Sequence, residues 1–191
     1  NTNSTAIVDE DMVHDFVTGA LKCERGLAIV PKLTKLLDSA RKSGVKVIFC
    51  NDAHVKGVDH ELKLWGEHAI AGTSGAQVIP ELKLCDKDYV VPKRRYSGFF
   101  RTDLELLLRE LGVDTVILTG LHTHMCVRHT AADAYCLGFD VAVAVDATDA
   151  FTEEDYISGI KYLKEVYGAK PYTVKQLTDA FEADTDNNFN S

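Results

Sequence analysis

A cysteine stands where an apolar segment gives way to a helical pattern. Residues Val116 to Leu118 form a short apolar run, typical of a strand buried on both faces, and the helical pattern begins at Cys126. The start of a helix carries partial positive charge and unpaired N–H groups. These favour a thiolate and could hold the oxyanion that forms when the thiolate attacks a carbonyl. Cys126 is therefore a candidate nucleophile for acyl transfer; the alternative is a small buried hydrophobic residue.

Acidic and basic residues follow other predicted strands of the same kind. Asp9, Asp11 and Asp15 come at or just after the first apolar run, and Lys93 follows the third. In open parallel sheets, ligands bind beyond the carboxyl ends of the strands, where the strand order reverses. A carboxylate beside Cys126 could accept the thiol proton, and a lysine would keep that carboxylate ionised. The spacing alone does not choose among the three aspartates.

The long irregular stretch from Asp52 to about Gly75 carries residues that could bind a metal ion. Asp52 and His54 form an Asp-x-His pair, which places two side chains on one side of an extended segment. His68 supplies a third ligand, and His60 is a candidate fourth. Three protein ligands with water completing the shell would make a reactive site in which zinc, iron or manganese fits. The alternative is that these histidines are ordinary solvated loop residues.

Strand and helix patterns alternate along the whole chain. Short apolar runs predict strands, and leucines at helical spacing followed by glycine predict helices that end at Gly44, Gly112 and Gly138. Thr152 with Asp155 resembles a capping box at the start of a further helix. This rhythm predicts an α/β fold, a three-layer αβα arrangement with a six-stranded, mainly parallel, Rossmann-like sheet. The six strands are expected at residues 5–8, 45–50, 89–91, 116–118, 141–145 and 170–174.

The composition predicts a soluble globular protein. The chain has 191 residues, of which 46% are hydrophobic and 26% charged. We expect one domain over residues 1–181 and a polar, frayed tail over residues 182–191. The net charge of −8 argues against nucleic-acid and membrane partners. Five cysteines without a CxxC pair indicate reduced thiols and a cytoplasmic location.

Several separated motifs together resemble one known family, the isochorismatase-like cysteine hydrolases. This superfamily includes nicotinamidases and N-carbamoylsarcosine amidases. The resemblance runs from about Ala6 to Thr152, and no single motif would make it specific. The motifs are Asp11-Met-Val-His-Asp-Phe16, Asp52-Ala-His54, Trp65-Gly-Glu-His68, Lys93-Arg-Arg-Tyr-Ser97 and Gly120-Leu-His-Thr-His-Met-Cys-Val127.

The resemblance implies a role for each matching residue. It implies that Asp11, Lys93 and Cys126 are the catalytic residues, which would select Asp11 from the three aspartates. By the same match, the metal ligands are Asp52, His54 and His68, with His60 an extra ligand seen in some members. Phe16 and Trp65 would be aromatic walls around a flat substrate. The oxyanion hole would use the backbone N–H groups of His122 and Cys126, beside a cis peptide between Leu121 and His122.

Two departures from the family pattern concern the pocket floor. His122 stands where a small residue is usual, and His124 stands where nicotinamidases tend to carry an acid. The resemblance as a whole implies a nicotinamidase-like cysteine amidohydrolase that cleaves a small carboxamide or carbamoyl C–N bond, without an organic cofactor and as a homo-oligomer.

One alternative is an N-carbamoylsarcosine amidase or related ureido-acid hydrolase, whose acidic substrate would need a cation. The candidate cations are Arg94, Arg95, Arg101 and Arg128. Two alternatives remain: an isochorismatase, and a catalytically silent binding protein on the same scaffold.

Overall fold

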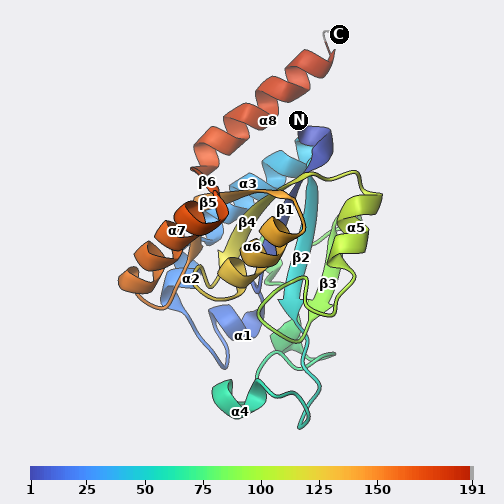
Figure 1. The fold of residues 1–191 in the computed structure, drawn as a ribbon. Coiled ribbons are helices and arrows are strands. Elements are labelled where there is room, and N and C mark those ends of the chain that lie inside the picture. Colours follow the sequence, from blue (N-terminus) through green and yellow to red (C-terminus); the bar gives the residue numbers. More distant parts are fainter. Residues whose placement is uncertain (190–191) are drawn as a thin grey trace.

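A computed structural model of the chain describes residues 1–189 and shows a parallel sheet between two layers of helices (Figure 1). All neighbouring strands are parallel, in the order β3-β2-β1-β4-β5-β6. The predicted fold class is therefore confirmed. The strands are β1 (Thr5–Glu10), β2 (Lys46–Asp52), β3 (Tyr89–Lys93), β4 (Thr115–Leu121), β5 (Asp140–Asp149) and β6 (Lys170–Tyr172).

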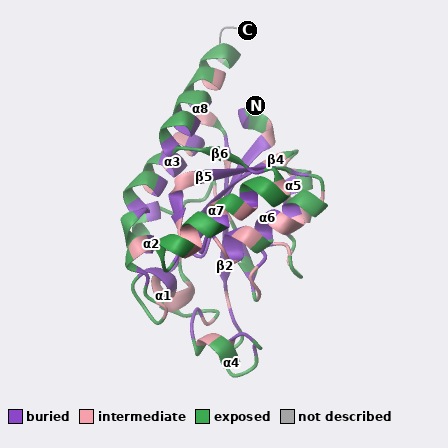
Figure 2. Ribbon diagram, turned by 60° about the vertical axis from the view of Figure 1, so that its left-hand side comes forward, coloured by how far each residue is buried: buried purple, intermediate pink, exposed green. Residues whose placement is uncertain are grey.

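Helices cover both faces of this sheet. The helices are α1 (His14–Val17), α2 (Glu24–Ala28), α3 (Val30–Ser43), α4 (Leu62–Trp65), α5 (Leu104–Glu110), α6 (Cys126–Cys136), α7 (Glu153–Tyr167) and α8 (Val174–Phe189). The buried side chains of α3 and α8 pack on one face. Those of α5, α6 and α7 pack on the other. Burial is concentrated in the sheet and on the inner sides of the helices (Figure 2). No helix in the described part of the chain is long and apolar enough to cross a membrane.

Local signals in the sequence set several helix ends. Gly44 ends α3 in the left-handed conformation, with φ of 79°, which costs glycine little. The Thr152 side chain accepts a hydrogen bond from the Asp155 N–H at 3.1 Å and caps the start of α7, as predicted. The short helices α1, α2 and α4 have four or five residues each and were not predicted.

The C-terminal segment differs from the prediction of a frayed tail. Helix α8 continues through Glu182 to Phe189, and residues 190–191 lie outside the described part. Leu177 and Phe181 bury their side chains in the core beside α3. Farther along, the Asp184 carboxylate accepts a hydrogen bond from the backbone N–H of Thr2 at 2.7 Å. These contacts support the helix beyond the point where its sequence becomes polar.

The strand order reverses between β1 and β4, which are direct neighbours. Their backbones approach closely at the carboxyl end, where Glu10 pairs with Gly120. A Cβ atom at position 120 would lie 2.1 Å from the Glu10 carbonyl oxygen, and Gly120 has φ of 91°. Only glycine fits both conditions. The close approach brings the segments after β1 and β4 together at the point where parallel sheets bind ligands.

Candidate active site

Four charged or nucleophilic side chains meet at the carboxyl edge of the sheet. Asp52 and Lys93 are the last residues of β2 and β3, and their backbones are paired in register. Asp11 directly follows β1, in the left-handed region with φ of 55°. Cys126 is the first residue of α6, after the turn that leaves β4. Parallel strands end on the same side, so residues far apart in sequence become neighbours.

Lys93 connects the other three. Its Nζ atom lies 3.1 Å from Asp11 Oδ2, 2.5 Å from Asp52 Oδ1 and 3.4 Å from Cys126 Sγ. The residue is 1% exposed. Burial works to lower the pKa of this lysine, but the charges of Asp11 and Asp52 outweigh it and raise the pKa well above its usual value. Lys93 is therefore a fixed positive charge beside Cys126.

Asp11 is held in place on several sides. Its Oδ1 atom accepts a hydrogen bond from the backbone N–H of Asp52 at 2.8 Å, while Oδ2 accepts from Lys93. Burial, followed by the charge of Asp52, raises the pKa of Asp11 to about 6. Lys93 and a hydrogen bond with the Cys126 thiol oppose that rise. A carboxyl with a pKa in this range can exchange a proton with a thiol near neutral pH.

The other two candidate aspartates, Asp9 and Asp15, have other hydrogen-bond partners. Asp9 is fully buried and accepts a hydrogen bond from the Thr119 hydroxyl at 2.7 Å. Asp15 accepts hydrogen bonds from the backbone N–H groups of Ala69 and Ala20, at 2.8 and 3.3 Å, and so ties the loop after β2 to α1. The geometry thus brings Asp11, and neither of its neighbours, to Cys126 and Lys93.

The Cys126 thiol lies in surroundings that oppose the effect of the helix start on its pKa. It is 3% exposed. Burial, then the charge of Asp11, raises the pKa of the thiol well above its usual value, although Lys93 pulls it down. The helix start favours the thiolate, whereas burial and the charges of Asp11 and Asp52 favour the thiol. The thiol needs a proton acceptor before it can attack, and Asp11 is in place.

The turn between β4 and α6 contains the cis peptide expected from the resemblance, between Leu121 and His122. Backbone N–H groups of Met125 and Val127 donate to the His122 carbonyl oxygen at 3.0 and 3.3 Å and hold the turn on the start of α6. N–H groups in the first turn of a helix have no partner within that helix. An oxyanion hole from the backbone N–H groups of His122 and Cys126 fits this turn.

Beside Asp52, four side chains form a group suited to a metal ion. Asp52, His54, Glu61 and His68 are buried, and their ligand atoms all lie within 4.8 Å of one another. Asp52 Oδ2 lies 3.2 Å from His54 Nε2 and 3.7 Å from His68 Nε2. Glu61 Oε2 lies 3.6 Å from His54 Nε2. The donor set is the one that zinc, iron and manganese accept in reactive sites.

The outer hydrogen bonds of the two histidines also fit a metal site. The Nδ1 atom of His54 lies 2.9 Å from Asp59 Oδ2, and the Nδ1 atom of His68 lies 2.8 Å from the Gly66 carbonyl oxygen. Such bonds orient a ligating histidine and leave its Nε2 atom to face the ion. The Arg94 guanidinium pairs with Asp59 in turn.

The fourth member of this group differs from the sequence-based candidate. His60 is exposed and lies outside the group, whereas Glu61 faces inward. Burial, followed by the charge of Asp52, raises the pKa of Glu61 to about 7. The loop after β2 has no regular period, so its sequence gave no indication of which of two adjacent polar residues turns inward.

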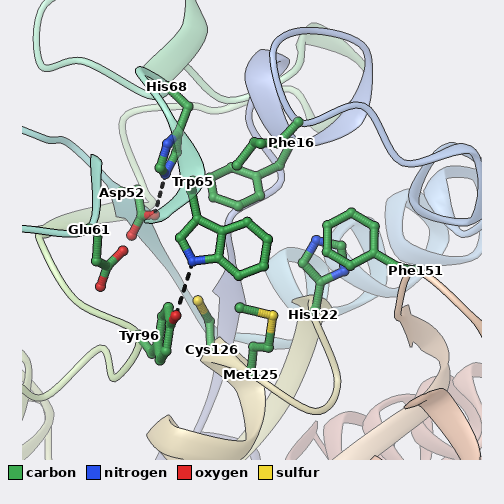
Figure 3. A pocket seen from close by; sticks show the side chains of 11 residues that line it. Phe16, Asp52, Glu61, Trp65, His68, Tyr96, His122, Met125, Cys126 and Phe151 are labelled. Atoms are coloured by element: carbon green, nitrogen blue, oxygen red, sulfur yellow. Dashed lines mark hydrogen bonds and ion pairs between the residues drawn. The ribbon is translucent and has the colours of Figure 1, made fainter. Parts of the chain in front are cut away.

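A pocket connects the metal-ligand group with Cys126. Its walls are mostly aromatic: Trp65 is central in Figure 3, and Phe16 lies behind it. The Trp65 indole N–H donates to the Tyr96 hydroxyl at 3.0 Å, which fixes the ring. Phe16 and Trp65 both line this pocket. The described residues that line the pocket are Phe16, Leu21, Asp52, Glu61, Trp65, His68, Tyr96, His122, Met125, Cys126 and Phe151.

Phe151 is a wall of the pocket that the sequence analysis missed. It follows β5 and stacks on His122, with ring centroids 3.9 Å apart and 25° between the planes. Residues after strands one to four were considered as site candidates, and the same argument applied to the fifth strand would have found Phe151. His124 lies near α7, with Nε2 3.8 Å from Asp155 Oδ2, and is absent from the pocket lining.

Comparison with known proteins places this site in a family. An isochorismatase domain model matches residues 5–176. The chain belongs to the isochorismatase family. This membership, together with the solved structures described next, confirms the predicted resemblance and the hydrolase class.

Three related proteins illustrate the range of the family. An N-carbamoylsarcosine amidase from Thermoplasma acidophilum is 37% identical, with a TM-score of 0.84 over 90% of this chain and 96% of that one. A pyrazinamidase of Pyrococcus horikoshii, solved in complex with zinc, is 29% identical, with a TM-score of 0.83 over 89% and 99% of the two chains. A probable inactive nicotinamidase of Arabidopsis thaliana is 31% identical over 92% of this chain and 95% of that protein.

Proposed function

We propose that this protein is a cysteine-dependent amidohydrolase that releases ammonia from a small, flat, uncharged carboxamide, as nicotinamidases do. The observation that carries the proposal is the contact of Lys93 with Asp11 and with Cys126, a residue that lines an aromatic pocket. A thiol, a carboxylate with a pKa of about 6 and a fixed cation supply a nucleophile, a proton carrier and charge stabilisation.

In the proposed mechanism, Cys126 Sγ attacks the amide carbon while its proton moves to the Asp11 carboxylate. The carbonyl oxygen gains the negative charge, and the backbone N–H groups of His122 and Cys126 stabilise it. Asp11 then gives the proton to the amide nitrogen, the C–N bond breaks, and ammonia leaves a thioester on Cys126. Asp11 next accepts a proton from water, whose oxygen displaces the thiol. The acid is released, and the proton returns to the sulfur.

We further propose that Asp52, His54, His68 and Glu61 hold one divalent ion, most readily zinc. The support is the buried donor group, with both histidines oriented through Nδ1, and the zinc in the related pyrazinamidase. A bound ion supplies a Lewis acid that can take a ring nitrogen or a water molecule. Asp52 also contacts Lys93, so the same carboxylate links the donor group to the reacting residues.

The pocket lining favours an uncharged substrate over a ureido acid. None of the described residues that line it is a lysine or arginine. Arg94 pairs with Asp59, and the Arg128 guanidinium lies 3.5 Å from the centre of the Tyr162 ring. Arg95 lines a separate pocket with Phe100, and Arg101 is exposed. The four arginines that were candidates for binding a substrate carboxylate therefore lie outside the pocket lining.

A second candidate function is N-carbamoylsarcosine hydrolysis, which the 37% identity to the amidase from Thermoplasma acidophilum favours. One ammonia-release assay on the metal-loaded enzyme, with nicotinamide, pyrazinamide and N-carbamoylsarcosine, separates the two. We expect kcat/KM for a neutral carboxamide to exceed that for N-carbamoylsarcosine by at least about 100-fold, the effect of roughly 3 kcal/mol of unpaired substrate charge. A preference for N-carbamoylsarcosine would establish the second function, and no release from any of them would refute both.

A further inference from the structure

The His122 side chain is a buried polar group without a protein partner. The residue is 1% exposed, and neither Nδ1 nor Nε2 has a hydrogen-bond partner among the described residues. A neutral imidazole offers one donor and one acceptor. Leaving both unpaired in the interior costs about 1–3 kcal/mol for each group. A polar ring that is kept in such a place fits a role in binding a ligand.

The rings around His122 leave its nitrogens to find a hydrogen-bond partner in the pocket. Phe151 stacks on one face of the ring, and the Phe16 ring lies 6.2 Å away at 56°. His124 lies 6.2 Å away in an edge-to-face arrangement. These rings fix the imidazole without hydrogen bonds to its nitrogens. His122 lines the same pocket as Cys126, so a substrate bound in this pocket can reach it.

Figure 3 shows that this ring and the metal-ligand group lie on opposite sides of the pocket. His122 and Phe151 lie on one side of Trp65, and Asp52, Glu61 and His68 lie on the other. Cys126 lies below Trp65, between them. A planar molecule whose carboxamide is at Cys126 can therefore meet polar groups at two separate edges.

The lowered pKa of His122 also favours the neutral imidazole that this role requires. Burial, followed by the nearby His124, lowers the pKa of His122 to about 4, with Asp155 acting in the opposite direction. Near neutral pH the ring can therefore donate one hydrogen bond and accept another. A hydroxyl or amino group can use either nitrogen, whereas a methyl group of similar size can use neither.

We infer that His122 recognises a second polar group of the substrate, a hydroxyl or amino group on the ring edge that faces away from the metal-ligand group. The inference rests on the proposed function and narrows its substrate class to substituted heteroaromatic carboxamides. A methyl group in the same place would leave both ring nitrogens without a hydrogen bond, which lowers its affinity relative to a hydroxyl or amino group.

The test measures kcat/KM for nicotinamides that carry a hydroxyl, an amino or a methyl group at the same ring carbon, at positions 5 and 6. In the wild type we expect the polar substituent to be preferred over methyl by at least about tenfold at one of the two positions, since tenfold corresponds to about 1.4 kcal/mol. In His122→Phe, which keeps a flat ring but removes both nitrogens, that preference should fall to about twofold or less.

The matched control is His129→Phe. His129 is exposed, and its Nδ1 atom lies 2.7 Å from the Met125 carbonyl oxygen. The substitution therefore removes a histidine of α6 that is outside the pocket lining. This variant should keep the wild-type preference. Equal use of polar and methyl compounds by the wild type would overturn the inference alone. Failure to hydrolyse nicotinamide and every derivative would overturn the proposed function and the inference with it.

A second measurement does not depend on the folding of His122→Phe. In Cys126→Ala with histidine labelled by 15N, addition of the preferred hydroxyl or amino compound should shift the His122 ring resonances. The methyl compound should leave them near their positions in the free protein. Equal shifts with both compounds, or no shift with either, would contradict recognition by His122.

Discussion

The two ends of the pocket are built in opposite ways. At the metal-ligand end, charged side chains pair with one another: Lys93 contacts two carboxylates, and both histidines have partners at Nδ1. At the other end, His122 lies among aromatic rings, and its nitrogens have no partner in the described part of the chain. Both ends are buried, so exposure to water does not explain the difference.

In the proposed function, this difference separates the groups proposed to carry out the reaction from the group proposed to recognise the substrate. Reacting charges must be held in place before the substrate arrives, and dense pairing holds them. A recognition group has to keep its hydrogen-bonding capacity for the ligand. Because such a group is neutral, its burial costs less free energy than the burial of a charge. Substitutions at the two ends should therefore fail in different ways.

The largest effect should come from the nucleophile at the reactive end. Cys126→Ala should reduce kcat/KM by at least about 10⁴-fold, since removing an attacking residue leaves binding and the oxyanion hole alone. Initial rates of ammonia release over a range of substrate concentrations measure the loss. Cys136→Ala is the control: it changes an exposed cysteine at the other end of α6 and should keep full activity. A Cys126→Ala enzyme that retains a tenth of the activity would refute the assignment of roles to this end.

A smaller effect should follow loss of the metal ion. We expect about one divalent ion per chain, and its removal by a chelator should lower activity at least about tenfold, with recovery on adding zinc, iron or manganese. Glu61→Gln and His68→Gln should both lower the metal content measured by elemental analysis. His60→Gln should not, because His60 is exposed and outside the donor group. Equal metal loss in His60→Gln and Glu61→Gln would contradict the proposed ligand set.

The smallest effect should come from the end of the pocket at His122. There we expect the free energy of unfolding to depend on pH. The pKa of His122 is lowered from 6.5 to about 4 by burial, followed by His124. The unfolded chain therefore binds more protons between these values, and the His122 contribution is complete above pH 6.5 and is lost as the pH falls toward 4. Between pH 7 and pH 5, the free energy of unfolding should fall by roughly 2 kcal/mol more in the wild type than in His122→Phe.

Urea denaturation at a series of pH values measures this dependence, with His129→Phe as the control that should follow the wild type. Parallel curves for the wild type and His122→Phe would show that His122 is not held neutral. The two ends of the pocket would then differ less than the structure indicates.

The sequence predicted the reactive end better than the recognition end, and the reason is geometric. Asp11, Asp52 and Lys93 end or follow parallel strands, so the fold alone brings them to one edge. The choice of Asp11 over Asp9 needed the family resemblance, because it depends on the partner of each side chain: Thr119 for Asp9 and Lys93 for Asp11. The resemblance also placed Phe16 and Trp65.

Features that depend on packing between distant segments were not predictable. Glu61 faces the metal-ligand group from a loop without a regular period. The stacking of Phe151 on His122 joins the ends of β5 and β4. The raised pKa of the Cys126 thiol results from burial beside Asp11, which the local helix start does not show. The extent of α8 depends on contacts with α3 and with Thr2.

The proposed function requires a covalent acyl intermediate between Cys126 and the carboxamide. Its most direct test is acid quenching of the enzyme during turnover of nicotinamide, followed by peptide mass spectrometry. We expect the peptide containing Cys126 to carry the added mass of the nicotinoyl group, and the peptides containing Cys23, Cys50, Cys85 and Cys136 to lack it. Turnover with no acyl group on Cys126, or with the group on another cysteine, would refute this assignment.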